Sequence, residues 1–265
     1  MSPAPAAISL DNVSKRYGES AAPVLDGVSL DVREREFLAV VGPSGSGKTT
    51  LLRLINRLID PSAGSVRVNG EDVQATDAVA LRRRIGYVFQ GTGLFPHLTV
   101  AENIAITPKL LGWDDARMAA RVDELIALVR LDRDRHRDRF PAQLSGGEGQ
   151  RVGVARALAA SPRIMLMDEP FGALDPLTRD ALGEDYRRLH GELGLTTVMI
   201  THDMLEAVLL ADRVAVIRNG RIIADGTPQA LMGGAQTNGV QDAYVRELMA
   251  APRRQAERLR ALERK

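Results

Sequence analysis

The stretch "FLAVVGPSGSGKTTLLRLINRL", residues 37–58, decides which fold we expect for this chain. Its first five residues are apolar and predict a buried strand, and the residues after the last glycine predict a helix. The loop between them consists of Gly42, Pro43, Ser44, Gly45, Ser46, Gly47, Lys48, Thr49 and Thr50. Glycines let backbone N–H groups close around an anion, Lys48 adds charge for the terminal phosphates, and the Thr49 hydroxyl can ligate Mg²⁺. The stretch therefore predicts a site that binds a nucleoside triphosphate.

A second motif, "IMLMDEP" at residues 164–170, places two carboxylates directly after an apolar run. Ligands of parallel sheets bind at the carboxyl ends of the strands, where Asp168 and Glu169 should emerge. We expect Asp168 to hold Mg²⁺ or one of its ligands, and Glu169 to polarise an attacking water as general base. Such a motif alone can be an ordinary turn, but beside a phosphate loop we interpret it as catalytic.

The rest of the chain alternates between predicted strands and helices, which indicates an α/β fold. The other β-rich runs are "VLDGVSLDV", "SVRVNG", "IGYVFQ", "TTVMIT" and "RVAVIRNGRIIADG". In the last of these, Asn219 and Gly220 predict the tight turn of a hairpin. Residues 94–160 show helical periodicity with little strand signal, so we expect a helical lobe inserted into the α/β core.

A third motif, "QLSGGEGQRVGVARAL" at residues 143–158, opens a predicted helix with Ser145, Gly146 and Gly147. A helix N-terminus offers unpaired N–H donors and a positive dipole end, so this start is suited to a phosphate. Because the chain already has a complete phosphate loop, we interpret the second cap as a half-site. It would be completed when two subunits enclose ATP between them.

With these motifs in view, "LSGGEGQ" resembles the signature of ATP-binding cassette (ABC) ATPases, and the resemblance covers about residues 8 to 230. It implies four further site residues. Tyr17 matches the aromatic residue that stacks on adenine, and Gln90 matches the glutamine that contacts Mg²⁺ and the attacking water. Asp175 matches the aspartate of the loop that contacts the opposite subunit, and His202 matches the switch histidine that contacts the γ-phosphate.

The resemblance also implies the architecture and the cofactors. We expect a P-loop NTPase core with an inserted helical lobe and an antiparallel β subdomain, together with ATP and Mg²⁺. The nucleotide-binding domain should occupy residues 1–235, with the lobe at about 91–160, and a helical tail should occupy residues 236–265. Gly149 departs from the family pattern, which has a larger polar residue there. It either loosens the first helical turn or is a harmless local variant.

The branch of the family is inferred from the segments that other branches carry beside the cassette and from further sequence resemblance. No run of about 18 apolar residues and no signal peptide are found, and Lys48 and Asp168 are only about 120 residues apart, too close for a long coiled-coil insertion. The stretches "LINRLIDPSAGSVRVNGEDV" and "RRRIGYVFQGTGLFPHLTVAENIAITPKLLGW" resemble ATPase subunits of bacterial glycine betaine, choline and related osmoprotectant importers. The implied partners are a second copy of the chain, an integral-membrane permease and, indirectly, a solute-binding protein. The implied location is the cytoplasmic face of the bacterial inner membrane.

Composition narrows the alternatives. The net charge of +1 argues against a nucleic-acid-coating surface, and the absence of cysteine excludes disulfides and thiolate metal sites. An importer ATPase for an amino acid, polyamine or inorganic anion stays open, as does a soluble ABC protein that lacks a permease. Phe95, Pro96 and Leu98 are expected to form apolar surface for a permease helix, although Leu98 equally fits packing inside the lobe. The basic C-terminal residues predict a solvated helix or a contact with a membrane or partner.

Overall fold

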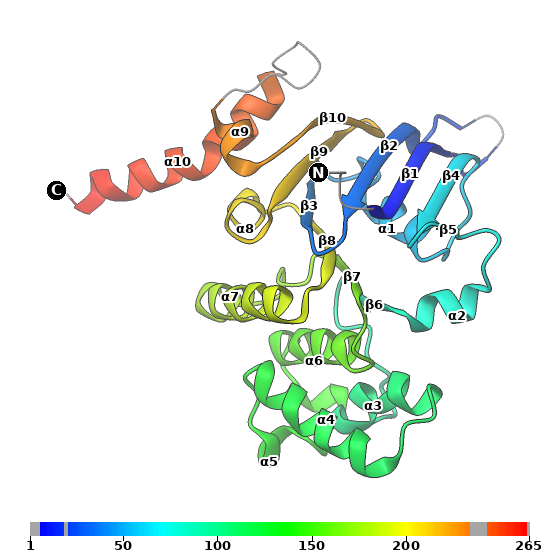
Figure 1. The fold of residues 1–265 in the computed structure, drawn as a ribbon. Coiled ribbons are helices and arrows are strands. Elements are labelled where there is room, and N and C mark those ends of the chain that lie inside the picture. Colours follow the sequence, from blue (N-terminus) through cyan, green and yellow to red (C-terminus); the bar gives the residue numbers. More distant parts are fainter. Residues whose placement is uncertain (1–5, 19–20, 234–242, 264–265) are drawn as a thin grey trace.

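The fold consists of two β-sheets joined to a group of helices that extends from one end of the molecule (Figure 1). The computed structural model describes residues 6–18, 21–233 and 243–263. The helical group forms the lower part of the view in Figure 1, and both sheets lie above it. Within the described residues, no helix combines the length and the apolar character needed to cross a membrane.

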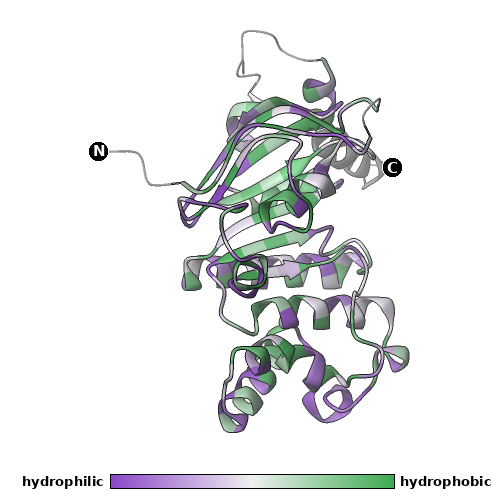
Figure 2. Ribbon diagram, turned by 90° about the vertical axis from the view of Figure 1, so that its right-hand side faces the viewer, coloured by the Kyte–Doolittle hydropathy of each residue, from purple (hydrophilic) through white to green (hydrophobic). Residues whose placement is uncertain are grey.

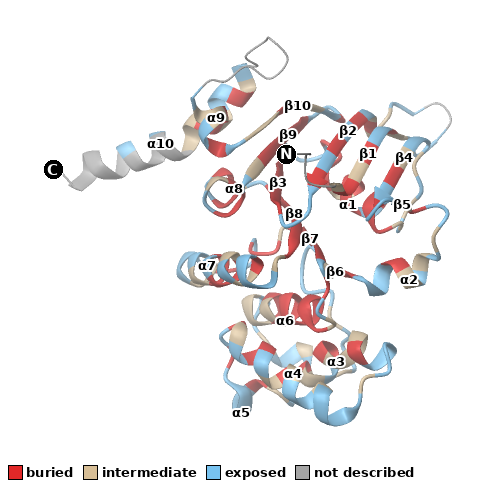
Figure 3. Cartoon of the chain, in the orientation of Figure 1, coloured by how far each residue is buried: buried red, intermediate tan, exposed pale blue. Residues whose placement is uncertain are grey.

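The larger sheet carries the core. Its strands lie in the order β10-β9-β3-β8-β7-β6. They are β3 (Phe37–Val41), β6 (Ile85–Val88), β7 (Ile164–Asp168), β8 (Thr196–Thr201), β9 (Arg213–Arg218) and β10 (Arg221–Gly226). The strands from β9 to β6 are parallel to their neighbours, and β10 alone in this sheet pairs antiparallel. Every residue of β3, β7 and β8 is buried, as Figure 3 shows in red, because helices and the second sheet cover both faces.

The smaller sheet is antiparallel, with the order β2-β1-β4-β5. Its strands are β1 (Ala6–Lys15), β2 (Leu25–Arg33), β4 (Ala63–Val68) and β5 (Glu71–Asp72). Strand β1 was not predicted from the sequence. Its pairing with β2 shifts register between Leu10 and Val13, where Asn12 has a positive φ of 49°. This bulge interrupts the alternation of apolar and polar residues that would otherwise reveal the strand.

The helices surround the larger sheet and fill the segment between β6 and β7. They are α1 (Lys48–Ile55), α2 (Ala78–Arg83), α3 (Val100–Leu110), α4 (Asp115–Leu128), α5 (Arg133–His136), the 3₁₀ helix η1 (Pro141–Gln143), α6 (Gly146–Leu158), α7 (Pro176–Leu193), α8 (Met204–Leu210), α9 (Pro228–Met232) and α10 (Ala243–Glu263). Helices α3 to α6 lie within the segment expected to be helical. Their apolar sides share one core with the parallel sheet, which includes Ile104, Leu125 and Phe171. Figure 2 shows the strands of the core as largely hydrophobic and much of the helical surface as hydrophilic.

The connection between β9 and β10 confirms the predicted hairpin turn. Asn219 and Gly220 join β9 to β10 with φ values of 50° and 75°, the left-handed pair that a type I′ hairpin turn requires. Helix α10 follows, and its buried Val245 and Met249 belong to the main core. The expected boundary between residues 235 and 236 lies outside the described residues, so the division into domain and tail stays a prediction.

Candidate active site

The loop between β3 and α1 has the form expected of a phosphate-binding loop. Gly47 precedes helix α1 with a φ of 102°, which an L side chain rarely adopts. Gly42 lies so close to β9 that a Cβ atom there would be 2.1 Å from the carbonyl oxygen of Ile217. Because α1 begins at Lys48, the N–H groups of its first turn have no partner inside the helix. The loop therefore offers unpaired donors at the positive end of a helix dipole.

Lys48 is the charge of this loop. Its side chain is buried, and Nζ donates to the carbonyl oxygens of Gly42 at 2.7 Å and Pro43 at 2.9 Å. Burial lowers the pKa of Lys48, and the carboxylates of Glu169 and Asp168 counteract that shift. An ammonium group with three donors keeps one for an incoming anion after these two hydrogen bonds.

Asp168 stands at the carboxyl end of β7 and faces the same loop. It is buried, and the Thr49 hydroxyl donates to its Oδ1 at 3.2 Å. Burial raises the pKa of Asp168, while the hydrogen bond from Thr49 opposes the shift. A hydroxyl oxygen and a carboxylate oxygen thus converge, and these are ligands that Mg²⁺ prefers.

Glu169 follows Asp168 with an unusual backbone conformation. Its φ is 48°, a left-handed conformation that costs free energy in a non-glycine residue. The N–H of Glu169 donates to the carbonyl oxygen of Ile200 at 3.0 Å, which holds this conformation against β8. The carboxylate then meets Gln90 and His202: Gln90 Nε2 donates to Oε2 at 3.2 Å, and His202 Nδ1 lies 3.4 Å from Oε1. Three predicted residues from three separate segments therefore converge on one point.

A cavity of about 420 Å³ lies among these groups. It is lined by Val24, Ser44, Gly45, Gly47, Lys48, Thr49, Thr50, Gln90, Glu169 and His202. Tyr17 does not form part of this lining; it is 57% exposed, and Lys15 Nζ lies 5.3 Å from the centre of its ring. Tyr17 is thus exposed enough to be available to a ligand, and its contact with adenine stays a prediction.

The signature residues occupy a different place from the cavity. Ser145 caps helix α6, and a Cβ atom on Gly146 would meet nothing within 4 Å. A Cβ atom on Gly147 would lie 3.2 Å from Leu174, so this turn packs beside the loop that leads to Asp175. Asp175 is exposed and caps α7 by accepting a hydrogen bond from the N–H of Thr178 at 3.0 Å. The two motifs thus lie next to each other, and none of their four predicted residues lines the cavity at the chain's own phosphate loop.

Residues that the motifs did not reveal hold the neighbouring loop. Asn103 is fully buried, accepts a hydrogen bond from the N–H of Phe95, and donates through Nδ2 to the carbonyl oxygens of Phe95, Leu98 and Thr99. Arg156 is also buried and donates to the carbonyl oxygen of Gly93 at 2.8 Å. No local pattern marks these residues, because their partners are backbone atoms of a neighbouring loop. Phe95 is 42% exposed, whereas Leu98 is half-buried.

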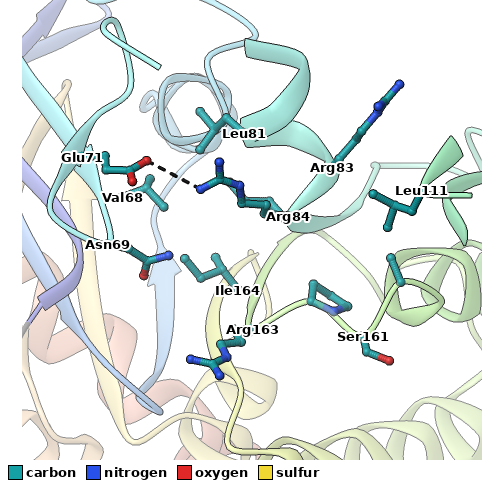
Figure 4. A pocket seen from close by; sticks show the side chains of 13 residues that line it. Val68, Asn69, Glu71, Leu81, Arg83, Arg84, Leu111, Ser161, Arg163 and Ile164 are labelled. Atoms are coloured by element: carbon teal, nitrogen blue, oxygen red, sulfur yellow. Dashed lines mark ion pairs between the residues drawn. The ribbon is translucent and has the colours of Figure 1, made fainter. Parts of the chain in front are cut away.

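A second cavity lies at the other end of the same strands (Figure 4). Its volume is about 320 Å³, and Ile85 and Ile164, the first residues of β6 and β7, are part of its wall. Arg84 forms an ion pair with Glu71 across it at 3.6 Å. Ligands of open parallel sheets bind at the carboxyl ends of the strands, so we assign the chemistry to the first cavity.

Comparison with known proteins identifies the family. The family model described as ABC transporter matches residues 25–172, which include the phosphate loop, the signature turn and both carboxylates. The chain belongs to the ABC transporter family. Within this family, the dimeric structure of an ATP-binding cassette in a post-hydrolysis state, bound to ADP and Pi, is 34% identical with a TM-score of 0.78. The match covers 83% of this chain and 98% of that cassette, so the ABC cassette fold expected from the sequence is confirmed.

Two curated ABC relatives show the range of transporters to which this chain is similar. The glycine betaine/carnitine/choline transport ATP-binding protein of Bacillus subtilis (strain 168) is 44% identical over 252 residues. That match covers 95% of this chain but 66% of the relative, so the chain spans slightly less than two thirds of its length. The sulfate/thiosulfate import ATP-binding protein of Caulobacter vibrioides is 47% identical over 234 residues, which cover 87% of this chain and 67% of that protein.

Proposed function

We propose that this chain is the ATP-hydrolysing subunit of an ABC importer, converting ATP and water to ADP and phosphate to drive uptake of a solute. The observation that carries the proposal is the convergence of Gln90 and His202 on the Glu169 carboxylate, beside the cavity that Lys48 and Thr49 line. A carboxylate in this position can accept a proton from a water molecule that attacks the γ-phosphorus.

In this proposal, each predicted residue has a distinct task. The loop from Gly42 to Thr50 binds the phosphates through its N–H groups, and Lys48 places its positive charge at the β- and γ-phosphates. Glu169 removes a proton from the attacking water, which Gln90 orients. His202, whose side chain is 68% exposed, contacts the γ-phosphate from the other side of Glu169. Tyr17 stacks on the adenine ring.

The residues present also fit Mg²⁺. The described residues include no group of three or more His, Asp or Glu side chains that could hold a metal by themselves. Mg²⁺ commonly takes one or two protein oxygens and completes its shell with water and substrate phosphates, so this arrangement suits it. Thr49, Asp168 and Gln90 are the residues that would hold it, and when bound it would offset the negative charge of the phosphates.

The separation of the signature turn from the cavity supports a head-to-tail dimer. None of Ser145, Gly146, Gly147 and Asp175 lines the cavity at the chain's own phosphate loop, and Ser145, Gly146 and Asp175 are exposed. We propose that these residues close over the nucleotide held by a second copy. Two ATP molecules would then be enclosed between two subunits, and each would contact both.

For the transported solute, we propose a quaternary amine or related osmoprotectant such as glycine betaine or choline. The supporting observation is the similarity to the Bacillus subtilis relative over almost the whole chain. The similar identity to a sulfate/thiosulfate import protein keeps an inorganic anion as the second candidate. The proposed partners are an integral-membrane permease, which the exposed Phe95 would contact, and a solute-binding protein. The chain would act at the cytoplasmic face of the bacterial inner membrane.

The catalytic proposal is tested by Glu169→Gln. This variant should bind ATP and accumulate as an ATP-bound dimer, and its turnover should fall by about 10²- to 10⁴-fold because the general base is lost. The matched control is Glu71→Gln, which removes an exposed carboxylate at the far cavity and should keep the ATPase rate. If Glu169→Gln hydrolyses ATP at the wild-type rate, Glu169 is not the base.

The solute proposal needs a different experiment. The chain is reconstituted with its permease and solute-binding protein, and ATPase stimulation is measured with glycine betaine, choline and sulfate in turn. Stimulation by a quaternary amine supports the proposal, and stimulation by sulfate alone selects the second candidate. A chain that copurifies with no membrane protein would instead favour a soluble ABC protein.

A further inference from the structure

The signature turn carries the carboxylate of Glu148, although the ligand proposed for this turn, a phosphate, is also negative. Glu148 lies in the first turn of α6, and its Oε2 accepts a hydrogen bond from the N–H of Ser145 at 2.7 Å. In return, the N–H of Glu148 donates to Ser145 Oγ at 3.2 Å, which completes a capping box. The cap stabilises the helix end, but it also brings a negative charge beside a turn proposed to receive a γ-phosphate. The carboxylate of Glu148 and a phosphate bound at this turn would both be negative and would therefore repel each other.

His136 meets this carboxylate from the last residue of α5. It is 4% exposed, and its Nε2 lies 2.9 Å from Glu148 Oε1. Its other ring nitrogen, Nδ1, lies 2.8 Å from the carbonyl oxygen of Asp132. A carbonyl oxygen only accepts hydrogen bonds, so Nδ1 must be protonated to make this contact.

The same reasoning determines whether the second ring nitrogen, Nε2, carries a proton. An ionised carboxylate also only accepts, so Nε2 must be protonated as well, unless Glu148 itself carries the proton. The hydrogen bonds from Ser145 and His136 lower the pKa of Glu148 to about 2, which leaves its carboxyl group ionised at neutral pH. The contacts on both sides of the ring therefore require an imidazolium ion.

Other cations near the pair are engaged elsewhere. Arg133 and Arg137 both pair with Asp123 of α4. Arg151 of α6 donates to the carbonyl oxygens of Val129 and Arg130, and it also interacts with Glu148 through space, without an ion pair between them. Further charged groups on the elements around the pair include Asp132, Asp134 and Arg135 of the α5 segment, and Glu102 of α3, which forms its own capping box with Thr99. Helix α4 adds Arg121, which pairs with Glu124, and α6 adds Arg156, which donates to the carbonyl oxygen of Gly93. Among the described residues, His136 is the one that forms an ion pair with Glu148.

We propose that His136 carries protons on both ring nitrogens and is a positioning residue of the signature turn, whose positive charge neutralises Glu148 so that Ser145, Gly146 and Gly147 can receive phosphate. The phosphate part rests on the half-site proposed above, whereas the protonation state of His136 does not. Neutralisation keeps both benefits of the carboxylate: the cap holds the turn in place, and the turn keeps the net attraction of a helix N-terminus for an anion.

The protonation state is tested by ¹⁵N NMR on protein labelled at histidine. The chain has four histidines, so comparison of the spectra of the wild type and His136→Phe assigns the ring signals of His136. At about pH 7.5 we expect both ring nitrogens of His136 to carry a proton, and Glu148→Gln should return the ring to the neutral form. A neutral ring with one protonated nitrogen in the wild type would overturn the proposal.

The effect on phosphate binding is tested by ATP-driven dimer formation in a Glu169→Gln background, measured by sedimentation against ATP concentration. His136→Phe should weaken dimer formation by about 5- to 30-fold, the effect of one unneutralised charge near the phosphate. Adding Glu148→Gln should restore it to within about threefold, because glutamine keeps the capping box without the charge. The control is His97→Phe, which alters an exposed histidine and should change nothing.

A double variant as defective as His136→Phe would show that the ring acts only by packing, and would overturn the proposal. If His136→Phe does not fold, the comparison of the histidine NMR spectra of the wild type and Glu148→Gln decides the protonation state. A Glu169→Gln reference without any ATP-dependent dimer would overturn the half-site and the phosphate part, and the NMR spectra would still decide the proton.

Discussion

The glycine that departs from the family pattern, Gly149, has a structural reason that can be tested. It lies in the buried side of α6, and a Cβ atom there would come within 2.5 Å of Thr92 Cγ2 and 3.3 Å of Thr92 Cβ. Real Cβ atoms essentially never approach another atom to 2.5 Å, so Gly149→Ala must displace Thr92 or the helix. Glycine at this position lets the loop after Gln90 pack directly on the signature helix.

Two opposing effects set the size of the change. Alanine in place of a helical glycine gains about 0.5–1 kcal/mol. Overpacking typically costs about 1–3 kcal/mol, and rotating the exposed Thr92 relieves the contact with Cγ2 but not that with Cβ. Gly149→Ala should therefore lower the free energy of unfolding by up to about 2 kcal/mol. In a Thr92→Ala background the contact with Cγ2 is absent and only the 3.3 Å contact with Cβ is left, so the same change should cost less than in the wild type, by about 1 kcal/mol or more.

The assay is urea unfolding of the four proteins of this double-mutant cycle, followed by circular dichroism. The control is Gly191→Ala in α7, where a Cβ atom would meet nothing within 4 Å, and which should stabilise the chain equally with or without Thr92. If Gly149→Ala has the same effect in both backgrounds, within about 0.5 kcal/mol, the contact with Thr92 does not explain the glycine.

Further variants test the two phosphate-binding elements, the partner surface and the cap. Lys48→Ala should abolish nucleotide binding by the isolated subunit, whereas Gly146→Asp should keep it and block dimer formation; equal loss of affinity in both, measured by titration calorimetry, would contradict the half-site. Phe95→Ala should preserve folding and basal ATPase but uncouple hydrolysis from uptake in the reconstituted transporter, and unchanged uptake would remove Phe95 from the coupling surface. The pKa of Glu148 is lowered from 4.5 to about 2, so its stabilisation is present above pH 4.5 and is lost as the pH falls toward 2. The stability advantage of the wild type over Glu148→Gln, measured by urea unfolding, should therefore disappear across that interval.

The sequence predicted those parts of the site that are local. A phosphate loop is one contiguous segment whose glycines and lysine carry their own signal, and Asp168 and Glu169 follow an apolar strand directly. Gln90 and His202 were implied by the resemblance to ABC ATPases, and the parallel strands β6 and β8 place both at the same edge of the sheet as Glu169.

What could not be predicted depends on contacts between distant segments. The bulge at Asn12 hid strand β1, since it breaks the period on which strand prediction rests. The tasks of Asn103 and His136 arise from partners on neighbouring segments, and neither residue stands in a recognisable pattern. For Gly149, the sequence left open a loosened turn or a neutral variant. The glycine is explained by the position of Thr92 against α6, which depends on how two segments pack together.

The four hydrogen bonds of Asn103 have a mechanical consequence. They attach residues 95–99 to α3, so a force applied at Phe95 would move this segment together with the helix instead of bending it. Arg156 fastens Gly93 to α6 in the same way. The exposed Gly91, with a φ of 77° and open space around it, is then the joint nearest to Gln90. Such a displacement would therefore be taken up by rotation at Gly91, the residue next to Gln90, whose side chain lines the cavity.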